Sequence, residues 1–209
     1  MQDNKYDSGK ENAIMKKLRT HLTAVALILA MALAMTGCGS SQDTADGGGK
    51  ESSYTDALAV LTAVVGAYTG DDLFAMYGGD QANAVMDAPG TFDISKTEEL
   101  EFTLGLPPEQ AEAVEDAASM VHMMNGNTFT GAAYRLKDGT DREAFAEAFK
   151  TYTLDREWIC GFPETLLIVD VDGCYIITAY GEAGIMETFK NNALSALSGA
   201  QVMVEAPLM

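Results

Sequence analysis

The chain has 209 residues and a formal net charge of −18, from 13 Lys and Arg against 31 Asp and Glu. A field of this sign repels nucleic-acid phosphates and anionic lipid headgroups, which argues against DNA, RNA and peripheral membrane surfaces as partners. The length allows one domain of ordinary size that buries a substantial core.

The N-terminal part of the chain has the layout of a secretory signal peptide. Residues 1–14 are polar and irregular, and we interpret them as a mis-called start or an extension. Residues 15–37 begin with a basic stretch, continue as an apolar run from Leu22 to Met35 and end in small residues. The apolar run is shorter than the roughly 20 residues that a membrane-spanning helix needs. The sequence therefore predicts export and removal of this segment.

The residues Met35, Thr36, Gly37 and Cys38 resemble a bacterial lipobox. In a lipobox the Cys is acylated on sulfur and becomes the first residue of the mature chain. The resemblance implies lipidation of Cys38 and a location at the cell membrane, lipid-anchored on the extracytoplasmic face, because two or more acyl chains hold a protein stably at a bilayer. An ordinary cleaved signal with a chance Cys is the alternative. A chain that starts at Cys38 has 8 basic and 28 acidic residues, a net charge of −20.

A tether and a single domain are predicted after Cys38. Residues 38–53 are rich in Gly, Ser and Asp and have no apolar periodicity, which is typical of a flexible linker. Residues 54–209 are expected to form one globular domain. Apolar residues recur at helical spacing from Tyr54 until Gly70, so the domain should begin with a helix.

The next segment predicts short helices. Residues 71–95 mix apolar residues with Gly and Pro, and we expect irregular helical pieces there. Ser95 and Glu98 have the spacing of a capping box that opens a helix. Pro107 and Pro108 should open another helix over residues 109–118, because proline fits the first helical turn.

The second half of the domain predicts an antiparallel sheet. Asn125-Gly126 and Asp172-Gly173 are dipeptides that favour the positive φ angles of a type I′ hairpin turn. The expected strands are residues 120–124, 128–137, 165–171, 174–180 and, at an edge, 201–205, and the expected amphipathic helices are 141–154 and 182–197. The fold class is therefore α+β in two layers: an antiparallel sheet of four to five strands, built from a strand-strand-helix unit used twice, with helices on one face and a helical N-terminal part.

Three segments of this half resemble a family of Gram-positive bacterial lipoproteins known as domain of unknown function 4358. They are MMNGNTFTGAAYRLKDG at 123–139, CGFPE at 160–164 and VDGCYIITAYG at 171–181. In the last segment Cys174 stands where the family has Asn. No activity is established for the family, so the resemblance implies fold and location and transfers no catalytic residue.

Cys160 and Cys174 remain after lipidation, and His122 is the one histidine beyond residue 37. A disulfide between the two cysteines would close a loop of about 15 residues and stabilise the domain by roughly 3 kcal/mol. Two buried thiols, a reactive thiol working with His122, and metal ligation are the other interpretations. The sequence has no HExxH, GxSxG, P-loop or GxGxxG motif, so it offers no catalytic residue, metal site or cofactor site of these kinds.

The loop of residues 155–164 is the candidate binding loop. It contains Arg156, Phe162, Pro163 and Trp158, the only tryptophan of the chain. Aromatic and Arg side chains are frequent anchors of binding patches, and functional residues favour loops on rigid scaffolds. The alternative is an aromatic plug that covers the open end of the core.

Together these patterns favour a membrane-anchored extracytoplasmic lipoprotein that acts as a binding or accessory module rather than an enzyme. It would present its sheet face or the loop around Trp158 to a protein or a small ligand. One alternative is a thiol-dependent enzyme that uses Cys160 or Cys174 with His122. The other is a small solute-receptor component, for which the domain is short because such receptors place a cleft between two lobes.

Overall fold

The structure is a computed structural model that describes residues 52–70 and 72–208. The predicted signal peptide, Cys38 and nearly all of the tether lie outside these residues. No helix within the described ranges is long and apolar enough to cross a membrane.

The described residues form an α+β fold. The helices are α2 (Ala57–Val65), α3 (Thr97–Leu104), the 3₁₀ helix η2 (Pro108–Ala113), α4 (Arg142–Leu154) and α5 (Ala183–Ala196). The strands are β1 (Met76–Gly78), β2 (Val85–Met86), β3 (Gly90–Thr91), β4 (Val114–His122), β5 (Phe129–Leu136), β6 (Thr165–Val171), β7 (Tyr175–Gly181) and β8 (Gln201–Pro207). They make one antiparallel sheet in the order β2-β1-β4-β5-β7-β6-β8, with β3 also paired to β4.

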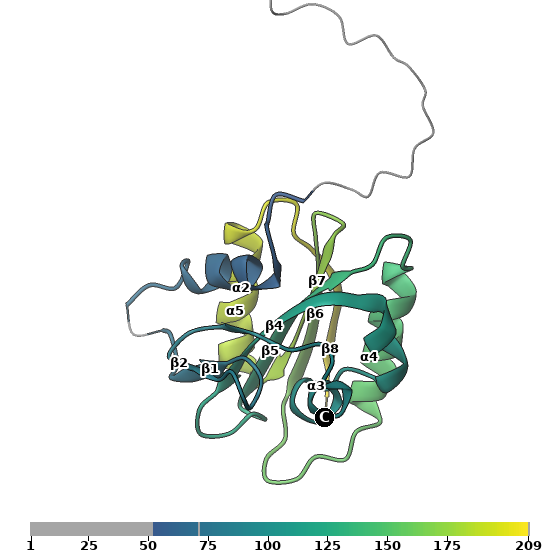
Figure 1. Cartoon of the computed structure of the whole chain (residues 1–209). Coiled ribbons are helices and arrows are strands. Elements are labelled where there is room, and N and C mark those ends of the chain that lie inside the picture. The colour runs from purple at the N-terminus through teal and green to yellow at the C-terminus, as the bar shows by residue number, and fades with distance from the viewer. Residues whose placement is uncertain (1–51, 71, 209) are drawn as a thin grey trace, which may run out of the picture. The chain divides into compact units, whose positions relative to one another are not determined.

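Helices cover both faces of this sheet, as Figure 1 shows. Side chains alternate along the strands, so Ile177 packs with α2 and α5 whereas its neighbour Ile176 packs with α3 and α4. The prediction of two layers with helices on one face is therefore wrong, and the domain has three layers. One strand does show in its sequence that both faces of the sheet are covered. In β6 every residue from Leu166 to Val169 is apolar, which is the pattern of a strand buried on both sides.

The prediction of four to five strands is also wrong, because the sheet has eight strands. The short strands β1, β2 and β3 lie in the segment expected to be irregular helix. With two or three residues each, they are too short to show a period in the sequence.

The predicted helix over residues 109–118 is wrong in its second half. The 3₁₀ helix η2 ends at Ala113, and β4 begins at Val114 and pairs with β5 as far as Val121. The long pairing with β5 outweighs the helix start signal of the two prolines. The capping box is wrong as well, because Ser95 donates to Asp93 instead of capping α3.

The elements after residue 128 lie close to their predicted ranges. Asp141 caps α4 by accepting a hydrogen bond of 2.9 Å from the Ala144 N–H. Asp172 and Gly173 both have positive φ, 49° and 74°, as the predicted type I′ turn between β6 and β7 requires. The prediction of such a turn at Asn125-Gly126 is wrong, because six residues join β4 to β5 and neither residue has positive φ.

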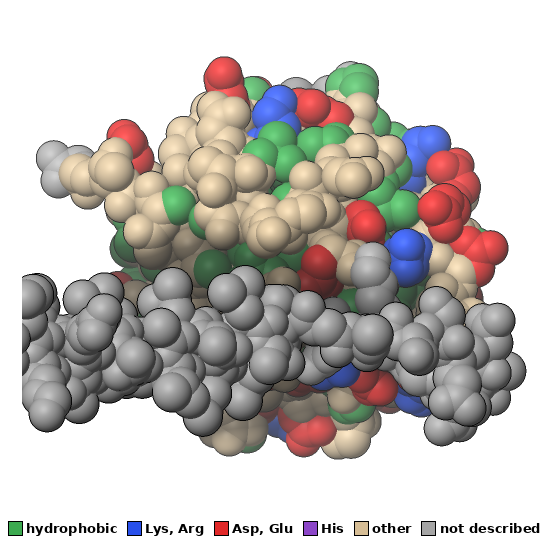
Figure 2. All heavy atoms as spheres, turned by 90° about the horizontal axis from the view of Figure 1, so that it is seen from above, with side chains coloured by type: hydrophobic (Ala, Val, Ile, Leu, Met, Phe, Trp, Pro, Cys, Tyr) green, Lys and Arg blue, Asp and Glu red, His purple; other side chains and the backbone are tan. Residues whose placement is uncertain are grey.

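The start of the described chain and the two longest loops of its second half lie at opposite ends of the sheet. At the tether end, the first described residues contact two connections: Ser52 Oγ donates to Asp172 Oδ2 in the β6–β7 turn over 2.7 Å, and the Ser198 N–H, between α5 and β8, donates to the Tyr54 hydroxyl over 3.0 Å. The connections 123–128 and 155–164 lie at the opposite, loop end (Figure 1). The seven residues of β6 separate the two ends by roughly 20 Å. Figure 2 views the tether end, where acidic side chains lie at several places around the face, with Lys and Arg beside some of them.

Candidate functional site: a cavity beside Trp158

A cavity of about 510 Å³ opens at the loop end. It lies among the ends of α3, β4, β5 and β7 and the two loops 123–128 and 155–164. Its lining residues are Tyr77, Phe102, Thr103, Val121, Gly126, Asn127, Thr130, Arg156, Glu157, Trp158, Ile159 and Tyr180. This volume falls in the range of sites that hold a small ligand or a large side chain of a partner. We call it the Trp158 cavity.

The strands supply the buried lining of the Trp158 cavity. Val121 lies near the end of β4, Thr130 near the start of β5 and Tyr180 near the end of β7, and all three are buried. The Thr130 hydroxyl donates to the Gly126 carbonyl over 2.9 Å, which fixes the loop above it. Burial raises the pKa of the Tyr180 hydroxyl, so this group stays protonated at neutral pH. The buried lining is therefore apolar with two fixed hydroxyl groups.

Trp158 lines the cavity and contacts two of the other lining residues, Tyr180 and Arg156. Its ring lies 5.1 Å from the ring of Tyr180, at an interplanar angle of 58°. The Arg156 guanidinium carbon lies 4.9 Å from the centre of the indole, and Arg156 Nη2 donates to the Phe102 carbonyl over 2.9 Å. Arg156 thus ties the loop to the last turn of α3, where carbonyl groups carry partial negative charge. The indole is held in place by these contacts.

Two asparagine side chains lock the loops together at the cavity mouth. Asn125 Nδ2 donates to the Cys160 carbonyl over 2.8 Å, and Asn127 Nδ2 donates to the Ile159 and Gly161 carbonyls, each over 3.0 Å. These three carbonyls belong to a turn that the backbone alone does not satisfy. The asparagine amides therefore set the shape of the loop that carries Trp158.

Replacing Asn127 by Ala should loosen this loop. The change removes two hydrogen bonds and leaves two carbonyls unpaired, so we expect the free energy of unfolding to fall by about 1 to 2 kcal/mol. Chymotrypsin should also cut the native variant in the 155–164 loop faster than the wild type. The matched control is Asn191→Ala on the exposed side of α5. This variant should unfold with no lower free energy than the wild type, and chymotrypsin should cut it no faster. Cleavage of Asn127→Ala at the wild-type rate would contradict the role assigned to this side chain.

Exposed apolar side chains surround the mouth of the cavity. Phe102 is 82%, Met124 84%, Ile159 80% and Phe162 63% exposed. Phe102 and Ile159 line the cavity itself, whereas Met124 and Phe162 lie on the two loops that the asparagines join. We call these four residues the apolar rim. Such clustered exposure of large apolar groups is typical of interaction sites.

The four residues predicted to form the binding loop have different positions relative to the cavity. Arg156 and Trp158 line the cavity, Phe162 is on its rim, and Pro163 is buried just before β6. Sequence reasoning missed Tyr180 and Asn127, because their part in the site depends on the pairing of distant strands and loops. The asparagines at 125 and 127 flank a glycine and indicated only a turn.

The possible disulfide between Cys160 and Cys174, one of the interpretations of the sequence, is not formed. Cys160 is exposed in the loop at the loop end, and Cys174 lies in the β6–β7 turn at the tether end. The length of β6, roughly 20 Å, separates them, whereas bridged cysteines have Cα atoms within about 7 Å. Spacing along the sequence suggested a short loop but could not show that a whole strand lies between the thiols.

His122 is part of the packing at the end of β4. Its ring stacks on Phe74 at 5.5 Å, and its Nδ1 accepts a hydrogen bond of 3.3 Å from the Met124 N–H. Residues 52–70 and 72–208 hold no cluster of three or more His, Cys, Asp or Glu suited to a metal ion. These contacts give no geometric support to a thiol and histidine pair.

The comparisons with known proteins add no relative. No family model matches the chain, and neither the curated proteins nor the solved structures contain a match. The resemblance to the lipoprotein family of the sequence analysis stays a prediction.

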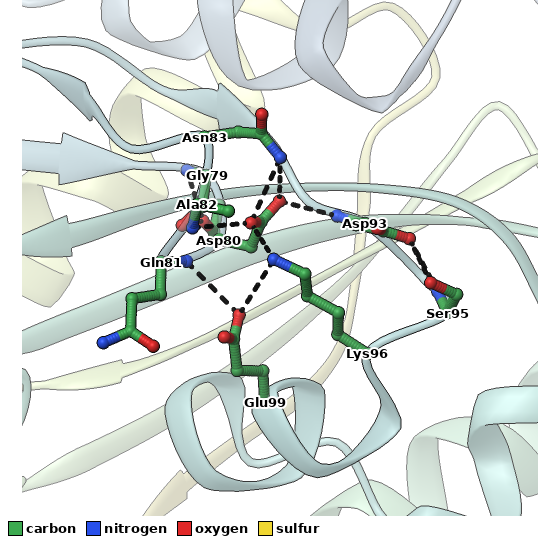
Figure 3. Close-up of polar contacts among 10 residues, drawn as sticks. Gly79, Asp80, Gln81, Ala82, Asn83, Asp93, Ser95, Lys96 and Glu99 are labelled. Atoms are coloured by element: carbon green, nitrogen blue, oxygen red, sulfur yellow. Dashed lines mark hydrogen bonds and ion pairs between the residues drawn. The ribbon is translucent and has the colours of Figure 1, made fainter.

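A second polar cluster lies away from the cavity, around Asp80 (Figure 3). The Asp80 side chain is 1% exposed and accepts hydrogen bonds from the Ala82 N–H at 2.9 Å, the Asp93 N–H at 3.2 Å and Asn83 Nδ2 at 2.9 Å. It also pairs with Lys96. Burial raises the pKa of Asp80, but the hydrogen bonds from Asn83, Lys96 and the backbone outweigh it and hold the pKa well below its ordinary value. The Asp80 carboxylate therefore stabilises this segment through its hydrogen bonds and is not placed to bind a ligand.

Proposed function

We propose that the protein is an extracytoplasmic lipoprotein of a Gram-positive bacterium, anchored through Cys38, whose domain is a binding module with the Trp158 cavity as its ligand site. The observation that supports this most is the contact of the Trp158 indole with both Arg156 and Tyr180, beside a cavity of about 510 Å³. A rigid aromatic wall gives contact area at little cost in conformational entropy when a ligand binds.

The chemistry of the lining favours binding over catalysis. Its ionisable side chains are Arg156, Glu157 and two tyrosines, Tyr77 and Tyr180. Arg156 is engaged with a backbone carbonyl and the indole, and burial raises the pKa of both tyrosines. None of these groups forms a nucleophile and base pair of the kind that acyl or phosphoryl transfer uses.

The position of the cavity also supports the proposal. Both faces of the sheet are covered by helices, so a sheet face is not available as the binding surface that the sequence analysis considered. The loop end lies opposite the end where Ser52 begins the described domain. A domain held through Cys38 therefore has its cavity at the end far from the attachment point.

We also propose that β4-β5-α4 and β6-β7-α5 are one strand-strand-helix unit used twice. The order of elements supports this, since each pair of adjacent strands is followed within five residues by a helix. The two helices cover opposite faces of the sheet, so the unit is repeated in order and not in packing.

The anchor is tested by the intact mass of the protein expressed in a bacterium that processes lipoproteins. We expect a mature chain that starts at Cys38 and carries the mass of its acyl chains. Cys160→Ser should keep that added mass, and Cys38→Ser should lose it. A mature wild-type chain without lipid would contradict the anchor and leave the binding proposal to its own test.

The ligand site is tested through Trp158, which gives the single indole N–H signal of the protein. Purified lipidated protein in a neutral detergent is titrated with N-acetyl-phenylalaninamide and with the disaccharide of N-acetylglucosamine. We expect at least one probe to move the indole signal to saturation, and Thr130→Trp, which fills the cavity, to abolish the shift. The two tryptophans of that variant are told apart by comparison with Thr130→Trp,Trp158→Phe. If neither probe shifts the signal, the cavity is not a site for ligands of these two classes.

A further inference from the structure

We propose that the occupant of the Trp158 cavity is a bulky apolar side chain from a basic peptide segment of a partner protein. This inference rests on the proposed function and names the class of ligand. It follows from three properties of the described residues: the use of their basic side chains, the distribution of acidic side chains around the apolar rim, and the exposure of that rim.

The basic side chains of the domain are already engaged. The described ranges contain seven Lys and Arg against 24 Asp and Glu. Five of the seven pair with carboxylates: Lys96 with Asp80, Arg135 with Glu115, Arg142 with Asp170, Lys150 with Glu147 and Lys190 with Glu205. The other two, Lys137 and Arg156, donate to the carbonyls of Glu112 and Phe102. An anionic ligand would find no unengaged cation among these residues, whereas the surplus of carboxylates favours a cationic partner.

Acidic residues accompany the apolar rim along the chain. Glu101 precedes Phe102, Glu157 lies two positions before Ile159, and Glu164 lies two positions after Phe162. Glu157 is exposed and lines the cavity. Glu101 accepts a hydrogen bond from the Tyr152 hydroxyl, and Glu164 accepts one from the Ala183 N–H. A partner that buries an apolar side chain here therefore meets the Glu157 carboxylate first, in a domain with a large surplus of carboxylates. Lys or Arg on either side of that side chain would complement these charges.

The exposure of the rim indicates a macromolecular partner rather than a ligand that fits entirely inside. Phe102, Met124, Ile159 and Phe162 are each more than three-fifths exposed while the cavity stands open beside them. A small molecule in the cavity would leave most of this apolar surface in water. A peptide that inserts one side chain covers the rim with its neighbouring residues, which is the usual anatomy of an anchor with a surrounding ring.

Two other occupants fit the charges less well. A second copy of this chain would bring the same surplus of carboxylates to the interface, and like charges oppose association. A bilayer with anionic headgroups is repelled for the same reason. Both are included as outcomes of the experiment.

The experiment follows Trp158 fluorescence of the lipidated protein in neutral detergent during titration with a short synthetic peptide that has one Phe flanked by lysines. We expect affinity at least tenfold higher than for the same peptide with Glu in place of Lys, and at least tenfold higher than with Ala in place of Phe. Affinity should fall as salt is raised from about 50 to about 500 mM, since the charges are exposed. Ile159→Ser should weaken binding at least fivefold, and Leu194→Ser, an exposed apolar change on α5, should leave it unchanged.

The outcomes separate this inference from the proposed function. If N-acetyl-phenylalaninamide or the disaccharide shifts Trp158 but the basic peptide binds no better than its acidic version, the inference is overturned and the ligand site stands. Equal binding of the Phe and Ala peptides overturns it too, because the cavity is then not used. Concentration-dependent dimerisation through the rim, or binding of the Cys38→Ser variant, which carries no lipid, to vesicles of anionic lipid, assigns the rim to another occupant. If no probe affects Trp158, both the inference and the ligand site fail.

Discussion

Replacing Asp80 by Asn should lower the free energy of unfolding by about 2 to 4 kcal/mol at neutral pH. The carboxylate is 1% exposed, and every contact that it makes is with a donor: two backbone N–H groups, Asn83 and Lys96. An amide supplies one oxygen and brings two N–H groups of its own into this ring of donors. The segment from Gly79 to Lys96, which Asp80 holds together, should lose order first.

The same substitution should change how stability depends on pH. The hydrogen bonds and Lys96 hold the pKa of Asp80 below its ordinary value, and an unfolded Asp titrates near about 3.9. The unfolded chain therefore binds a proton before the folded chain does as the pH falls. The contribution of Asp80 is complete above about pH 5 and declines as the pH drops below about 4 toward the folded pKa. Asp80→Asn should remove this part of the acid sensitivity.

Urea denaturation at pH 7 and at pH 3.5 measures both effects. The matched control is Asp138→Asn, an exposed carboxylate in the turn after β5, which should change stability by less than about 0.5 kcal/mol. If Asp80→Asn were as stable as this control and kept the wild-type loss of stability at pH 3.5, the structural role of Asp80 would be refuted.

Gly78→Ala should destabilise the domain by about 3 kcal/mol or more. A Cβ built at Gly78 would lie 2.1 Å from the Gly90 nitrogen, 2.4 Å from the Pro89 carbonyl carbon and 2.5 Å from the Ser119 oxygen. All three are backbone atoms, so no side chain can turn aside to make room. The methyl group would push β1 away from β3 and β4, and their pairing at this edge of the sheet would be lost.

Gly184→Ala is the matched control for this prediction. A Cβ at Gly184 meets nothing within 4 Å, and the residue lies in α5. Alanine favours the helix over glycine, so we expect this variant to gain up to about 1 kcal/mol. Thermal unfolding followed by circular dichroism compares the two variants. A Gly78→Ala protein as stable as the wild type would mean that β1 and β3 do not approach as closely as the structure shows.

Sequence periodicity predicted the long elements of the second half and missed the short ones. The helices α4 and α5 and the strands β5 to β8 have enough residues to show a period and clear caps or turns at their ends. The strands β1 to β3 have two or three residues and depend on pairing with β4, which no local pattern reveals. β4 begins directly after the 3₁₀ helix η2, so the strand predicted at residues 120–124 captured only its last three residues.

Only the part of the candidate site that lies in the loop 155–164 could be predicted from the sequence. Trp158 and Arg156 stood out because aromatic and Arg side chains are concentrated between residues 155 and 164. Tyr180 and Asn127 join them across the sheet, and their partners follow from strand order rather than from spacing. The two cysteines also show that spacing along the chain does not give distance in the fold. They are only 14 positions apart, but the full length of β6 lies between them.

We propose that this protein binds its ligand at the loop end around Trp158. Hydrogen-deuterium exchange of the full-length protein, with and without the Phe-containing basic peptide, tests this proposal. We expect slower exchange on binding in residues 102–105, 123–130 and 156–162, with no change in α2 or in the β6–β7 turn. Protection confined to the tether end, or spread evenly over the acidic surface, would show that the ligand does not bind around Trp158.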